Sequence, residues 1–259
     1  MYRVKEALKK YLIALSVASI LNIDCLKRMG KGEFEGNFIS VYLNSFTGGI
    51  RTMENGEHVL VLYLFDLAYL LILSIIFGTD LYKEIYGTGI YVMTRIKSRS
   101  KWMLRKVGKL LGECIISAIS YCSCVLLLQL YHTRVICDKN AILAYFITVI
   151  FVAYNIFLVA LIINAVSIMG KISYGVCAGT ASLVIMVIYV IKYDEISMFA
   201  GNLKYMYLAP VNMINLFHET DLKFVLLVFA YYTLIVGLIV FGLLKYIKRM
   251  DIKLLESDL

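Results

Sequence analysis

Few side chains in this sequence could carry out chemistry. The three histidines, His58, His132 and His218, are far apart, and none has a partner at the spacing of a metal site. The H-E-x-x-H and G-x-S-x-G motifs of hydrolases do not occur. The Gly-Thr-Gly at residues 87–89 lacks the third glycine and the lysine of a phosphate-binding loop. We therefore expect no catalytic, cofactor-binding or metal site, and hence no enzyme.

Two acids lie inside apolar stretches, where a charge is costly and is a functional candidate by default. Asp66 either lines a cargo path or makes a structural hydrogen bond. Glu113 is close to Lys109, and we interpret it as an interfacial or hydrogen-bonded group. Three amides are expected to form hydrogen bonds between helices: Gln129, Asn155 and Asn164.

The composition is that of a membrane protein. Of the 259 residues, 61% are hydrophobic and only 17% are charged, and the mean hydropathy is +0.81. Soluble domains carry roughly 25% charged residues. These values exclude a disordered chain, a collagen-like fibre and an ordinary cytosolic enzyme. The residues left outside the spans are too few and too scattered for a nucleotide-hydrolysing domain, so energy for uphill transport would enter from another subunit or an ion gradient.

The apolar stretches predict an all-α protein with six transmembrane helices in one domain, residues 1–259. The predicted spans are residues 11–26, 59–78, 110–131, 141–169, 174–191 and 222–243. The single proline, Pro210, fits a chain of long helices. The basic, amphipathic residues 1–10 predict a helix on the membrane surface. A signal peptide is the alternative, but no small-residue cleavage site follows.

The distribution of Lys and Arg predicts the orientation. If both termini are cytoplasmic, the inner segments hold 17 of the 26 Lys and Arg residues. The formal net charge of +8 then reflects inner loops rather than binding to nucleic acid.

Residues 79–109 form the most informative segment. They are far more than a turn between two spans needs, which indicates docking onto a cytoplasmic partner. The first half predicts a short surface helix, and the second half a basic approach to the third span. Five residues are expected to anchor the segment to membrane lipid: Arg95, Lys97, Arg99, Trp102 and Lys106. The alternative is an ordinary basic inner loop held on anionic lipid.

The pattern E-x-x-G-T-G-I-Y-V-M-T-R-x-x-S-R-x-K-W-x-x-x-K at residues 84–106 resembles the region after the second span in ABC-2-type permeases. These are the membrane subunits of certain ATP-binding-cassette exporters. The resemblance extends to a polar segment at residues 37–43 before Gly48 and Gly49. It also includes the proline-containing residues 206–217, which in that family form a re-entrant hairpin on the outer side.

The resemblance implies a homodimer of permeases with a dimer of cytoplasmic ABC ATPase subunits. ATP and Mg²⁺ would bind to the ATPase, and no cofactor to this chain. A coupling helix at residues 84–94 and the turn at residues 170–173 would contact the ATPase. Glu84 would pair with a basic residue of the ATPase, and Tyr86 and Tyr91 would fill apolar hollows on its surface. The expected coupling residues are Glu84, Tyr86, Gly87, Gly89, Tyr91, Thr94, Gly170 and Lys171.

The function expected from this resemblance is ATP-driven export of an amphipathic peptide, such as a toxin or antimicrobial peptide, or of a lipophilic compound across a bacterial plasma membrane. An ion-coupled secondary carrier is the first alternative. It is disfavoured because such carriers have broken helices, whereas the helices predicted here are unbroken. A non-transporting membrane immunity protein is the second alternative.

Overall fold

The computed structural model describes residues 11–13, 15–17, 19–20, 67–89, 95–96, 98–133, 139–200 and 222–249. These residues are almost entirely helical and contain no strand, which confirms the all-α fold for this part of the chain. The predicted surface helix at residues 1–10 and the predicted outer hairpin at residues 206–217 lie outside the described residues.

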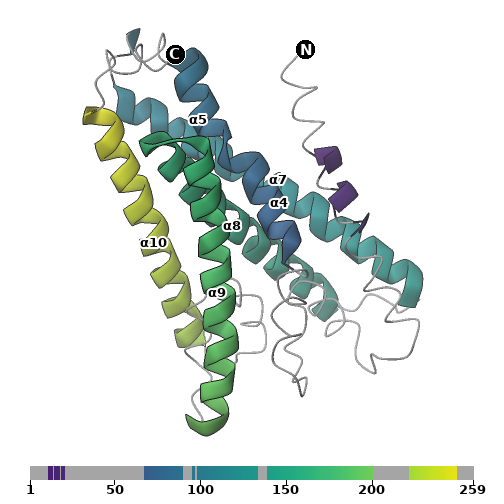
Figure 1. Ribbon diagram of the computed structural model, residues 1–259. Helices are drawn as coiled ribbons and strands as arrows, with labels where there is room; N and C mark the ends of the chain where they lie inside the picture. Colours follow the sequence, from purple (N-terminus) through teal and green to yellow (C-terminus); the bar gives the residue numbers. More distant parts are fainter. Residues whose placement is uncertain are drawn as a thin grey trace.

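Within the described part of the chain, seven helical elements have defined bounds, and Figure 1 shows their arrangement. They are α4 (Ala68–Gly78), α5 (Asp80–Glu84), the π-helical turn η1 (Ile85–Gly89), α7 (Arg99–Thr133), α8 (Lys139–Met169), α9 (Ile172–Ala200) and α10 (Leu222–Arg249).

Four of these helices are long and apolar enough to cross a membrane. The spanning stretches are Arg99–Leu128, Tyr145–Met169, Ile172–Tyr189 and Leu226–Arg249, which correspond to the last four of the six predicted spans. The first two predicted spans are described only in part. Residues 11–13, 15–17 and 19–20 are helical, and α4 covers the second half of the predicted span 59–78.

Three helices extend beyond the predicted spans. α7 begins at Arg99 rather than at residue 110, α9 continues to Ala200, and α10 continues to Arg249. Hydropathy marks where an apolar stretch ends, but Lys, Arg, Met and Leu are good helix formers, so the helices continue into polar sequence. At a rise of 1.5 Å per residue, α7 is about 50 Å long, whereas a bilayer core is about 30 Å thick. The basic first turns of α7 therefore belong to the spanning helix itself.

Helix α8 lies at the centre of the bundle. In an 18-residue apolar stretch of α8, 72% of the residues are buried, compared with 17% in the equivalent stretch of α10. Helices α4, α7, α9 and α10 all contact α8, as Figure 1 shows. Many of its apolar side chains, such as Val152, Ile156 and Ile163, are fully buried. A displacement of α8 would thus change its packing against each of these helices.

Small residues allow α8 to approach its neighbours closely. On α9, Gly175 and Gly179 form a G-x-x-x-G motif that faces Ile163 of α8. On the other side of α8, a Cβ atom added at Gly78 of α4 would lie 2.7 Å from the Cβ atom of Ile163. Ile163 therefore packs between three positions that have no room for a larger residue than glycine.

One end of the bundle collects the segments that were predicted to lie inside. Figure 1 shows α5, the first turns of α7, the α8–α9 turn and the last turn of α10 at the same end. Exposed basic side chains from four of these places lie there: Lys83, Lys101, Arg105, Lys171, Lys245 and Lys248. We call this the basic end. That it faces the cytoplasm stays a prediction.

Candidate functional site

Helix α5 follows α4 after a break at Thr79, and the side chain of Asn164 on α8 fills this break. The Asn164 Nδ2 donates to the carbonyl oxygen of Phe77 at 3.2 Å. The Asn164 Oδ1 accepts from the backbone N–H groups of Leu81 and Tyr82 at 3.0 and 3.3 Å. Phe77 and Leu81 are four residues apart, so a continuous α-helix would bond their carbonyl and N–H groups to each other. The amide thus takes the place of a helical hydrogen bond.

The three predicted interhelical amides have different outcomes. Asn164 is confirmed, and its side chain is buried with both polar atoms bonded. Asn155 is also buried, but its Nδ2 donates to Phe151 of its own helix, and its Oδ1 has no hydrogen-bond partner among the described residues. The interhelical prediction for Asn155 is therefore not supported by its hydrogen bonds. The side chain of Gln129 lies outside the described residues.

The expectation of unbroken helices is wrong at the end of α4. Besides the break at Thr79, residues 85–89 form the π-helical turn η1, which contains Gly87 and Gly89. Wide turns of this kind are rare and are found frequently at functional sites. The break could not be predicted from the local sequence, because the groups that stabilise it come from α8.

Tyr86 connects η1 to the end of α8. Its hydroxyl group donates to the carbonyl oxygen of Ile168 at 3.2 Å, and its ring stacks on Tyr82 with centroids 4.4 Å apart. Ile168 lies two residues before Gly170, where the α8–α9 turn begins. The hydrogen bond therefore joins the first region predicted to contact an ATPase, residues 84–94, to the end of α8, two residues before the second region, residues 170–173. Tyr86 is half-buried by its own chain, whereas Lys171 is exposed.

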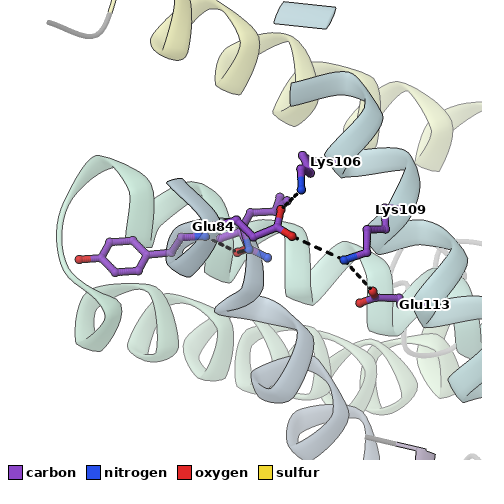
Figure 2. Close-up of polar contacts among 7 residues, drawn as sticks. Glu84, Lys106, Lys109 and Glu113 are labelled. Carbon is purple, nitrogen blue, oxygen red and sulfur yellow. Dashed lines mark hydrogen bonds and ion pairs between the residues drawn. The ribbon is translucent and has the colours of Figure 1, made fainter. Parts of the chain in front are cut away.

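Figure 2 shows a chain of ion pairs between α5 and α7. The Glu84 Oε2 lies 2.6 Å from the Lys106 Nζ, and the Glu84 Oε1 lies 3.5 Å from the Lys109 Nζ. Lys109 also pairs with Glu113, one turn further along α7, at 3.3 Å. Glu84, predicted to pair with a partner protein, is thus paired inside its own chain. Glu113 is thus bonded to Lys109, and its location at a membrane interface stays a prediction.

The residues predicted to anchor the segment to lipid are not equivalent. Lys106 lies over the Trp102 ring, 5.5 Å from the centroid, and Trp102 packs against the hydrophobic core. Arg95 is exposed and Arg99 is half-buried. The predicted site residues Asp66, Tyr91, Thr94 and Lys97 lie outside the described residues.

The glycines of the candidate site differ in how much room they have. A Cβ atom at Gly87 would meet nothing within 4 Å. A Cβ atom at Gly170 would lie 3.1 Å from the Tyr174 ring. Gly87 therefore offers an open position on the surface of η1, which can carry a probe without disturbing the packing.

No family model, curated protein or solved structure matches the chain. Within the described part of the chain, no three His, Cys, Asp or Glu residues are grouped so that they could hold a metal ion. The fold defines a helical protein whose four long apolar helices suggest a membrane protein. Its most distinctive feature is the basic end, where a broken helix, a π-helical turn and an ion-pair chain meet.

Proposed function

We propose that this chain is the membrane subunit of an ATP-driven exporter of the ABC-2 permease type, in a bacterial plasma membrane. It moves an amphipathic peptide or a lipophilic compound out of the cell, and a separate ATPase that binds ATP and Mg²⁺ supplies the energy. The observation that carries the proposal is the hydrogen bond from Tyr86 to Ile168, because it attaches the first expected ATPase contact to the end of α8, next to the second, at the basic end.

The contacts at the basic end would transmit a movement of α5 to the neighbouring helices. The segment formed by α5 and η1 is bonded to α8 through Asn164 and Tyr86, and it is bonded to α7 through Glu84. Helix α8 in turn packs against all the other described spans. A partner that moves α5 would therefore act on at least three helices at once, which is what a subunit without its own energy source requires.

The exposed faces of the bundle support membrane lipid and a second copy of the chain as partners. On α10 the exposed side chains include Leu234, Leu238 and Phe241, each at least 60% exposed. On α7, Ile115 and Ile119 are exposed, and a Cβ atom at Gly112 would meet nothing within 4 Å. These faces suit lipid chains, and one of them would close the interface of the proposed homodimer. Two facing bundles would leave room for a cargo path that one bundle lacks.

The helix break between α4 and α5 favours one competing function, an ion-coupled carrier, because carriers of that kind bind ions at broken helices. At this break, however, the Asn164 amide already bonds the backbone groups of Phe77 and Leu81. The nearby carboxylate of Glu84 is paired with two lysines. No open set of oxygen ligands remains among these groups, and we therefore favour the exporter.

Purification of the protein from its native membrane tests the proposal. We expect a P-loop ATPase of roughly 200–300 residues to elute with this chain in equal amounts. In reconstituted vesicles, transport should stop when ATP is withheld. Transport that continues without ATP and follows an ion gradient would contradict the proposal and support the carrier. If the chain protects cells from a peptide without transporting anything, the immunity function is correct instead.

A further inference from the structure

We propose that Asn164 is a positioning residue that holds α4 and α5 in a broken form, and that its withdrawal lets the two join into one continuous helix. Its role in coupling rests on the proposed function, but the two forms of the helix do not. The geometry behind this inference is the insertion of one amide between the carbonyl group of Phe77 and the N–H group of Leu81.

The carbonyl oxygen of Phe77 also accepts from the backbone N–H of Thr79, so the N–H group of Leu81 is the one that depends most on the Asn164 amide. Both groups lie in a buried part of the bundle, where Phe77 and Leu81 have almost no exposed surface. A buried backbone group without a hydrogen bond is strongly disfavoured. If the Asn164 amide leaves, the helical bond between Phe77 and Leu81 is the nearest replacement. The segment therefore has two satisfied forms, one broken with the amide inserted and one continuous without it.

The backbone at the break can change between these forms with little rotation. Thr79 has φ −104° and ψ −5°, and a regular helix has values near −63° and −42°. No proline lies in the segment to prevent the helical bond. Gly78, directly before the break, also lets Ile163 of α8 pack closely against the end of α4. The break is therefore maintained by α8 rather than by the local sequence of α4 and α5.

The position of Asn164 connects the break to the second contact point. Asn164 lies on the last part of α8, between the tight packing at Ile163 and the turn at Gly170. A partner that displaces this turn would move the amide, and the direction of α5 and η1 would change with it. The two predicted ATPase contacts would then move together, because the position of α8 determines the direction of α5.

The test measures the distance between two spin labels in detergent or vesicles, without any ATPase. One label is placed at Lys83 on α5 and the other at Tyr174 on α9, both of which are exposed. The native cysteines are replaced beforehand. In Asn164→Leu, which is similar in size but cannot form the bonds, we expect a shift of the main distance as α5 joins α4. Asn155→Leu is the matched control, because Asn155 is equally buried but bonds only to its own helix.

A conservative variant separates positioning from general packing. In Asn164→Asp the neutral acid still offers one donor and one acceptor, so we expect the distance of the parent protein. Hydrogen exchange gives a second measurement, in which the N–H group of Leu81 should stay protected in Asn164→Leu because it bonds to Phe77. If the leucine variant does not accumulate, Asn164→Ser is measured with the same expectations.

The proposal is wrong if Asn164→Leu keeps the parent distance, or if it shifts no more than Asn155→Leu. Faster exchange at Leu81 in the leucine variant would also contradict it, since the N–H group would then have found no new partner. None of these measurements uses nucleotide or a partner. Failure to purify an ATPase would therefore contradict the proposed function but not the two helix forms. An unchanged distance would contradict the two helix forms but not the proposed function.

Discussion

The carboxylate of Glu84 lies 2.6 Å from the ammonium group of Lys106, and this ion pair joins α5 to the first turns of α7. The sequence divides the same region into a docking half and a lipid-anchoring half, with one of these residues in each. In the folded chain the two halves form one unit. The side chains are 32% and 26% exposed, so the pair contributes only about 0.2–1 kcal/mol to stability. Its importance would lie in transmitting motion.

We expect Lys106→Gln combined with Lys109→Gln to impair coupling in the same way as Glu84→Gln, because either change removes both ion pairs between α5 and α7. Stimulated ATP hydrolysis and binding of the ATPase are the measurements. Lys101→Gln is the control, since it removes an exposed charge from the same helix. If only Glu84→Gln impairs coupling, Glu84 acts directly on the partner, and the connection to α7 has no functional role.

Gly175→Ala should destabilise the protein. The new Cβ atom would meet the side chain of Ser167 and the backbone carbonyl of Ile163, and the backbone cannot move aside easily. Overpacking of this kind costs about 1–3 kcal/mol. Gly112→Ala is the matched control, because its Cβ atom would meet nothing within 4 Å. Thermal unfolding in detergent should show a lower midpoint for the first variant only. Equal midpoints would mean that α8 and α9 are not as close as described.

Tyr154→Phe should weaken the attachment of α10 to α8. The Tyr154 hydroxyl group donates to the Tyr232 carbonyl oxygen at 2.5 Å, and the rings of the two residues lie 5.7 Å apart. Hydrogen bonds between membrane helices contribute about 0.6 kcal/mol on average, so we expect a small loss of stability with the fold intact. Tyr174→Phe, at an exposed position, should cause none. A loss of the same size in both variants would show that the bond contributes nothing.

The orientation of the basic end is tested by labelling intact cells. A cysteine at Lys223, near the start of α10, should react with a reagent that cannot cross membranes, and a cysteine at Lys171 should react only after the cells are opened. The two positions lie near opposite ends of the bundle. Labelling of the Lys171 position from outside would reverse the orientation derived from the charge distribution.

The sequence predicts the existence of the long helices well, since apolar stretches of bilayer length have few other uses. It predicts their ends less well, because the basic residues after Arg99 form helix as readily as the apolar ones. The break at Thr79 could not be predicted locally, since the amide that fills it lies 83 residues beyond Leu81 in the chain. The Glu84–Lys106 pair was missed for a similar reason, because it depends on where α7 begins. The glycine motif at Gly175, in contrast, is local in the sequence and predicts the close approach of α9 to a neighbouring helix.

Cross-linking from the basic end to the ATPase tests the central claim most directly. A cysteine with a short cross-linker is introduced at Gly87 in η1, where a Cβ atom has free space, and in a second variant at Lys171. The control position is Leu227 in the first half of α10, which is 61% exposed. The account predicts that the first two positions form cross-links to a P-loop ATPase that elutes with the chain, and that Leu227 forms none. Absence of a cross-link at both Gly87 and Lys171 while the ATPase remains bound, or an equal yield at Leu227, would contradict it.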